Sequence, residues 1–186
     1  MNKSEKRLQN VSITKLDTVV EFYEEVLQTT IKRAIELRKA GKYKQSRSLL
    51  RTLLSQENCA AKAHLQIAWS YDNEGKEHQA IEHYLSSLSG DLSEVERFDA
   101  LFGLACTHRS FGNYKEALNY FEKVTSEYPD SVEAQPFYAM CLYNLGRHKE
   151  AISLLLKLLV TTTDNDAIQE YQRAILLYAE DLDRKW

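Results

Sequence analysis

The stretch that decides the fold is residues 112–151, GNYKEALNYFEKVTSEYPDSVEAQPFYAMCLYNLGRHKEA. It begins with GNYKEA and ends with GRHKEA, and similar motifs occur upstream as GKYKQS from Gly41 and GKEHQA from Gly75. The four glycines that open these motifs, the last being Gly146, are therefore separated by 34, 37 and 34 residues. Self-similarity at such a spacing indicates an internal repeat, in which each copy folds as one unit of supersecondary structure.

Three further positions repeat in register with these glycines. An alanine stands seven residues before each glycine, a small residue five after it, and a large apolar or aromatic residue nine after it. These residues are Ala34, Ala68, Ala105 and Ala139; Ser46, Ala80, Ala117 and Ala151; and Leu50, Tyr84, Phe121 and Leu155. On either side of the glycine lies an amphipathic segment of about 14 residues. The pattern predicts helical hairpins that cross closely at the small residues and stack through the large ones.

The composition also favours an all-α protein and excludes several classes of function. Six glycines and two prolines in 186 residues are too few for the tight turns of a β-sandwich or barrel. A net charge of −3 provides no basic field for nucleic acid. No apolar run approaches the roughly 18 residues of a membrane span, and residues 1–17 lack the apolar segment of a signal peptide. We therefore expect a cytoplasmic protein with no nucleic acid and no membrane among its partners.

The four glycine motifs, together with Pro129 in SEYPDS, resemble the tetratricopeptide repeat, whose period of about 34 residues they share. The family's aromatic residue near the start of the first helix is missing in every copy. The resemblance implies an α-solenoid of about four helix-turn-helix repeats with an extended N-terminal helix and a C-terminal capping helix.

The expected boundaries follow from this alignment and from the apolar stripes at either end. A single domain is predicted over residues 15–183, after a mobile N-terminus at residues 1–14. The N-terminal helix is expected to begin near Leu16 and to end near Ala40. The expected repeats and capping helix are 27–60, 61–97, 98–131, 132–164 and 165–183.

A second stripe on the first helix of each repeat lies about 80–140° from the core stripe, at about 100° per residue. In tetratricopeptide proteins this stripe lines the concave face, so the resemblance implies a groove that binds a partner protein. Its apolar columns and its polar column (Arg38, Asp72, Arg109 and Tyr143) are expected to anchor and to orient that partner, respectively. The predicted residues are Ile31, Ile35, Arg38, Leu65, Trp69, Asp72, Phe102, Cys106, Arg109, Pro136, Met140 and Tyr143. An alternative is that a helix of this chain, or of a second copy, covers the stripe.

The sequence contains no recognisable catalytic or metal-binding set. Of its five histidines, only His78 and His83 are close in sequence, and five residues apart on a helix they do not share a face. Cys59, Cys106 and Cys141 form no CxxC pair and are expected to be buried free thiols. We therefore expect a protein that is not an enzyme and has no cofactor and no metal.

The leading hypothesis is a non-catalytic adaptor that binds a peptide or helix of another protein in an apolar groove. Two alternatives stay open. One is a self-assembling structural homo-oligomer, such as a homodimer, which the long N-terminal helix and the apolar segment ISLLLKLLV at 152–160 favour. The other is a small acidic chaperone resembling those of bacterial type III secretion. The carboxylate clamp of co-chaperones in this family is absent, because Leu65, Trp69, Gly103, Glu133 and Phe137 stand at the corresponding positions.

Overall fold

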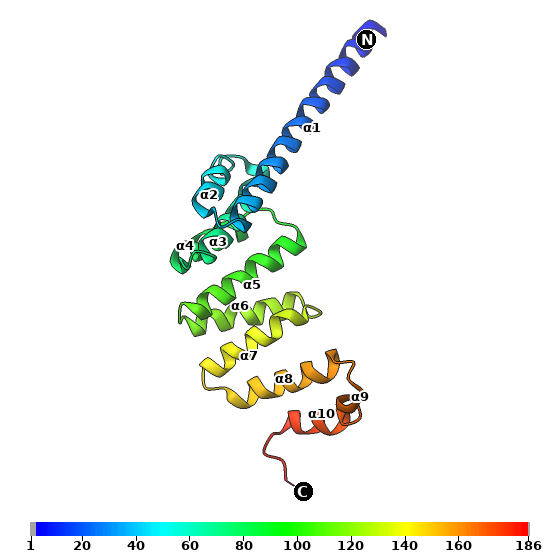
Figure 1. Cartoon of the computed structure of the whole chain (residues 1–186). Helices are drawn as coiled ribbons and strands as arrows, with labels where there is room; N and C mark the ends of the chain where they lie inside the picture. The colour runs from blue at the N-terminus through cyan, green and yellow to red at the C-terminus, as the bar shows by residue number, and fades with distance from the viewer. Residues whose placement is uncertain (1–2, 186) are drawn as a thin grey trace.

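The computed structural model describes the backbone of residues 3–185 and, from residue 21 onward, the side chains. Helices stack one after another along the chain, with no strand in the described part (Figure 1). Their bounds are α1 (Lys3–Lys39), α2 (Tyr43–Arg51), α3 (Glu57–Asp72), α4 (Glu77–Leu88), α5 (Glu94–Ser110), α6 (Tyr114–Glu127), the 3₁₀ turn η1 (Val132–Ala134), α7 (Gln135–Asn144), α8 (His148–Thr162), α9 (Asp166–Gln169) and α10 (Gln172–Glu180). The all-α solenoid expected from the repeats is confirmed.

The four hairpins, α1–α2, α3–α4, α5–α6 and α7–α8, close with the same turn. Each motif glycine has a positive φ, for example 69° at Gly75. There the Gly75 N–H donates to the Asp72 carbonyl and the Lys76 N–H to the Tyr71 carbonyl. Equivalent pairs of hydrogen bonds form at the other three glycines. This arrangement ends a helix in a left-handed residue, which glycine adopts without steric cost.

The small residues of the repeat lie where the two helices of a hairpin cross. Ala68 and Ala105 have no exposed surface, and neither have Ala80 and Ala117 on the facing helices. Ser46 replaces alanine in the first hairpin and donates its hydroxyl proton to the Ala34 carbonyl at 2.7 Å. The polar substitution is therefore satisfied inside the core.

The large residues nine positions after the motif glycines were predicted to fill the space between hairpins. They are buried in the first three hairpins but not in the fourth. Leu50, Tyr84 and Phe121 are at most 1% exposed, whereas Leu155 is 43% exposed. The expectation that Leu155 fills a space between hairpins is therefore wrong. No fifth hairpin follows, and α10 approaches α8 at Ser153, whose hydroxyl donates to the Ala179 carbonyl at 2.6 Å.

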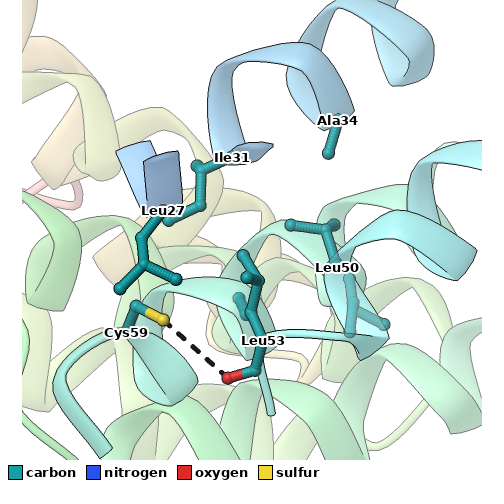
Figure 2. Packing of buried hydrophobic residues seen from close by; sticks show 8 residues of the cluster. Leu27, Ile31, Ala34, Leu50, Leu53 and Cys59 are labelled. Atoms are coloured by element: carbon teal, nitrogen blue, oxygen red, sulfur yellow. Dashed lines mark hydrogen bonds between the residues drawn. The ribbon is translucent and has the colours of Figure 1, made fainter. Parts of the chain in front are cut away.

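The N-terminal end of the core joins α1, α2 and α3 (Figure 2). Leu27, Ile31 and Ala34 of α1 pack in one buried cluster with Leu50 of α2. The cluster also holds Leu53, which follows α2, and Cys59 of α3, whose Sγ–H donates to the Leu53 carbonyl at 3.8 Å. The second half of α1 is therefore the first helix of the first hairpin.

The first half of α1 extends further than the sequence predicted. The helix begins at Lys3, not near Leu16, because no glycine or proline interrupts residues 3–39. This half projects away from the stack (Figure 1). The mobility expected of residues 1–14 stays a prediction, and residues 1–2 lie outside the described part.

The capping helix expected over 165–183 is instead two short helices, α9 and α10. The break falls at Tyr171, whose φ of −98° and ψ of 6° depart from helical values. Just before it, the Gln169 amide donates to the carbonyls of Val160 and Thr163, at 2.9 and 2.8 Å. Because these bonds hold α9 at the end of α8, the chain turns before α10 packs back along α8.

Candidate functional site

A groove of about 480 Å³ lies beside α3 and α5, between α1 and α7. Ten residues line the groove. Five of them are among the twelve residues predicted for the concave stripe, and helical periodicity did not predict the other five. The predicted ones are Arg38, Trp69, Asp72, Phe102 and Cys106; the others are Asn73, Tyr84, Asp99, Gly103 and Phe137. The structure therefore brings together the middle of the predicted stripe.

The remaining seven predicted residues lie elsewhere. Ile31 and Leu65 are only 8% and 1% exposed and belong to the core, so their assignment to a groove surface is corrected. Leu65 packs with Tyr84 and Leu104 of neighbouring helices, which close over it. Ile35 is partly buried against the N-terminal core cluster. Four further predicted residues do not line the groove: Arg109, Pro136, Met140 and Tyr143. Of these, Met140 and Tyr143 are exposed.

A buried polar network forms one wall of the groove. The Tyr84 hydroxyl donates to Asp72 Oδ2 at 2.5 Å, and the Thr107 hydroxyl donates to Asp72 Oδ1 at 2.9 Å. Burial raises the pKa of the Asp72 carboxyl, while these two hydrogen bonds oppose the rise. Asp72 thus links α3 to α4 and α5, and its hydrogen-bonding capacity is largely used within the protein.

The two arginines of the predicted polar column also join neighbouring hairpins. Arg38 Nη1 donates to Asn73 Oδ1 at 3.2 Å, and Arg109 Nη1 donates to Asn144 Oδ1 at 3.3 Å. In both cases the arginine bonds an asparagine 35 residues further along the chain. The Arg38 guanidinium lies 5.1 Å from the centre of the Trp69 ring, and burial lowers its pKa. This column therefore braces adjacent repeats.

Aromatic rings line the other side of the groove. The Phe102 ring lies 5.6 Å from Phe98 in a stacked pair and 5.2 Å from Phe137 in an edge-to-face pair. Phe137 comes from α7, on the next hairpin, and is 38% exposed. With Trp69 on α3, these rings offer a partly exposed apolar surface.

The cysteines are free thiols, as expected. Cys59 and Cys141 are buried, and Cys106 is half-buried in the groove wall. Burial raises the pKa of Cys106 to about 12. A thiol with such a pKa stays protonated at neutral pH and is a poor nucleophile and metal ligand.

Two histidines that the sequence analysis did not connect meet between α3 and α4. Nδ1 of His64 lies 2.8 Å from Nδ1 of His83, and the Tyr71 ring stacks on His83 with 5.6 Å between ring centres. Burial lowers the pKa of His83 to about 4, with further lowering from His64, Arg51 and Arg47; burial also lowers the pKa of His64. The neutral pair is therefore the stable form.

Because of the His64–His83 pair, we expect the stability of the folded protein to fall in acid. Because both histidine pKa values are lower in the folded protein, the unfolded chain binds more protons between pH 6.5 and 4, and unfolding becomes easier as pH falls through that window. We expect the pair to lower Tm by about 2–4 °C between pH 7 and pH 5. Melting curves of His83→Asn should show a smaller drop than the wild type.

His78→Asn is the matched control, because His78 lies on the same helix but is exposed. Its pH dependence of Tm should match the wild type. Equal pH dependence in wild type and His83→Asn would contradict the role assigned to the pair.

Residues 21–185, whose side chains the structure describes, contain no group of three or more histidine, cysteine or acidic side chains able to hold a metal ion. None of the described helices is both long and apolar enough to cross a membrane.

Comparisons with known proteins agree with this architecture. A family model described as tetratrico peptide repeat matches residues 61–182. Among solved structures, the crystal structure of MamA protein is similar, with a TM-score of 0.62 and 17% sequence identity. The similarity covers 92% of this chain and 90% of that one, and at this identity it shows the fold alone. No curated protein matches the chain.

Proposed function

The chain belongs to the tetratrico peptide repeat family, and we propose that it is a non-catalytic adaptor. In this proposal it binds a peptide or helix of another protein in the groove between Trp69 and Phe102. Repeats of this kind support a general role as a protein-interaction scaffold. Binding of a peptide or helix in this groove is supported by one observation: the Trp69 and Phe102 side chains both line it and stay only partly buried. Fully burying an exposed side chain of this kind contributes roughly 1.5–3 kcal/mol, and covering the part that Trp69 and Phe102 still expose contributes a share of that.

The walls of the groove suit a preformed binding surface. The Asp72 hydrogen bonds and the Arg38–Asn73 hydrogen bond cross between helices and hold the lining in place. A site that is already ordered loses little conformational entropy when a partner binds. Aromatic residues in such a pocket are the residues that most often dominate binding energy.

Replacing Trp69 and Phe102 together by alanine is expected to weaken partner capture at least about tenfold, or about 1.4 kcal/mol. The reason is the loss of the apolar surface that a partner would cover. Affinity capture from cells, with the bound partner quantified by mass spectrometry, measures the effect. Normal binding by a folded double variant would place the partner on another face.

Phe111→Ala is the control, since Phe111 is 52% exposed and lies outside the groove. It should capture the partner as the wild type does. A double variant that fails to fold would instead assign Trp69 and Phe102 to the core and contradict the groove proposal.

Self-assembly is the second candidate, because α8 carries an exposed apolar face. Ile152, Leu155 and Leu159 are 48%, 43% and 41% exposed, and their spacing of three and four residues places them on one side of the helix. Leu159 also borders an apolar pocket of about 510 Å³ beside Tyr171 and Tyr178. A face of this kind on a monomer favours contact with another apolar surface. The secretion-chaperone alternative stays a prediction.

Light scattering at several concentrations tests self-assembly. We expect the apparent mass to rise to at least a dimer for the wild type, and Leu155→Glu with Leu159→Glu to stay monomeric, because a buried charge would oppose association. Leu85→Glu, at a 46% exposed leucine on α4, is the control. A wild type that is monomeric at every concentration would exclude this candidate.

A further inference from the structure

Asp99 is the lining carboxylate that the protein leaves without a partner. It lies on α5, one turn before Phe102, and is half-buried in the groove. Among residues 21–185, no ion pair and no side-chain hydrogen bond given by the structure includes it. Two basic side chains of α5 and α3 bind other carboxylates: Arg97 lies 3.0 Å from Glu127, and Lys62 lies 3.3 Å from Glu96.

The other charged groups of the lining are differently placed. Asp72 accepts hydrogen bonds from Tyr84 and Thr107. Arg38 donates to an amide oxygen of Asn73 and lies over the Trp69 ring. Asp99 is thus the acidic group with free acceptor capacity in the groove.

The surroundings of Asp99 are electrostatically negative. Burial raises the pKa of its carboxyl, and Glu96 and Glu133 raise it further. The folded protein therefore holds this carboxylate at a cost, which a cation entering the groove would reduce. An acidic partner group would increase the cost by repulsion, and an apolar one would increase it by removing water from the carboxylate.

The aromatic rings beside Asp99 are also suited to contact a basic side chain. Phe102 and Phe137 meet edge to face, with 5.2 Å between ring centres, and Phe137 is 38% exposed. A guanidinium or ammonium group within about 6 Å of a ring centre is attracted by its negative face. The methylene stem of such a side chain can at the same time pack on apolar surface.

From these contacts we infer that the groove recognises a partner segment by an arginine or lysine side chain, which pairs with the Asp99 carboxylate and packs against Phe102 and Phe137. Apolar residues next to that side chain cover Trp69. The inference rests on the proposed function, because it names the chemistry of the partner that the same groove binds. Its occupant is a basic, partly apolar segment of another protein.

Selection from a random peptide display library on the full-length protein tests it. Wild type, Asp99→Asn and Trp69→Ala/Phe102→Ala are each used as bait. We expect wild type to enrich peptides with arginine or lysine flanked by apolar residues, and Asp99→Asn to enrich apolar peptides without that basic preference. An enriched basic peptide should bind Asp99→Asn about tenfold more weakly, or by about 1.4 kcal/mol, because the charged hydrogen bond to Asp99 is lost.

Substitution on the peptide side makes the test specific. Replacing its basic residue by methionine should weaken binding to wild type about tenfold and leave binding to Asp99→Asn unchanged, because the pair is already lost. Asp91→Asn, at an exposed position outside the groove, is the matched control and should bind as wild type does.

The outcomes separate the two proposals. Groove-dependent peptides without a basic preference, or basic peptides that bind Asp99→Asn normally, overturn the inference and leave the proposed function standing. A selection with no peptide sensitive to Trp69→Ala/Phe102→Ala overturns the proposed function and the inference with it. A dimer that dissociates on Trp69→Ala/Phe102→Ala makes a second copy the occupant and overturns both, because the proposed function requires another protein in the groove.

Discussion

Gly103→Ala is expected to destabilise the protein by about 1–3 kcal/mol, although alanine is the better helix former. Gly103 lies inside α5, and a Cβ atom there would lie 2.5 Å from Oη of Tyr84 and 2.6 and 2.7 Å from two of its ring carbons. Tyr84 is 1% exposed and its hydroxyl is bound to Asp72. Moving the ring away from the new Cβ would break this hydrogen bond and disturb its buried packing.

Two effects of this substitution on the free energy of unfolding oppose each other: the close contact with Tyr84 lowers it, and the higher helix propensity of alanine raises it. In an exposed helix interior, replacing glycine by alanine stabilises by about 1 kcal/mol. Urea unfolding followed by circular dichroism measures the difference, with Ser86→Ala on the exposed face of α4 expected within about 0.5 kcal/mol of wild type. If Gly103→Ala proved more stable than wild type, the close contact between α4 and α5 would not exist as described.

Arg47→Ala is expected to destabilise the protein by about 2–3 kcal/mol, because it removes the charged donor to the buried Ser70 carbonyl and hydroxyl and leaves a buried acceptor unsatisfied. Arg47 is 4% exposed and lies on α2. Its guanidinium donates to the Ser70 carbonyl and hydroxyl at 3.2 and 3.0 Å and to Glu74 at 2.6 Å. It also stacks on Tyr71, 4.2 Å from the ring centre. Its loss would leave the first two hairpins without this link.

Arg33→Ala provides the comparison, because Arg33 and Glu36 form an ion pair of 3.0 Å with side chains 65% and 54% exposed. Such surface pairs contribute at most about 1 kcal/mol. Arg47→Lys should be intermediate, since lysine keeps the charge without the forked geometry. Equal unfolding midpoints for Arg33→Ala and Arg47→Ala would contradict the structural role assigned to Arg47.

The sequence predicted the hairpins well because their signals are local. A glycine such as Gly75 ends a helix in a left-handed turn wherever it stands, and an alanine such as Ala105 permits a close crossing whatever its neighbours are. Helix ends at the two termini were predicted less well. No breaker marks the beginning of α1, and the interruption at Tyr171 accompanies hydrogen bonds from Gln169 to the preceding helix.

The candidate site could be predicted only in its middle. Helical periodicity gives the direction of a side chain relative to its own helix. It placed Trp69 and Phe102 on one stripe, and both line the groove. The same reasoning placed Leu65 there, yet α4 of its own hairpin and α5 of the next one cover Leu65 almost completely. Which neighbour covers a face depends on how the hairpins stack.

By itself, then, the amino-acid sequence determined the unit of the fold and its number of copies. Only the tertiary structure decided which side chains meet across units. Arg47 and Ser70 are 23 residues apart, and Asp72 and Thr107 are 35. The physical reason is that spacing along the chain defines a face of one helix, whereas burial and pairing depend on the rotation between consecutive hairpins, to which residues of every copy contribute.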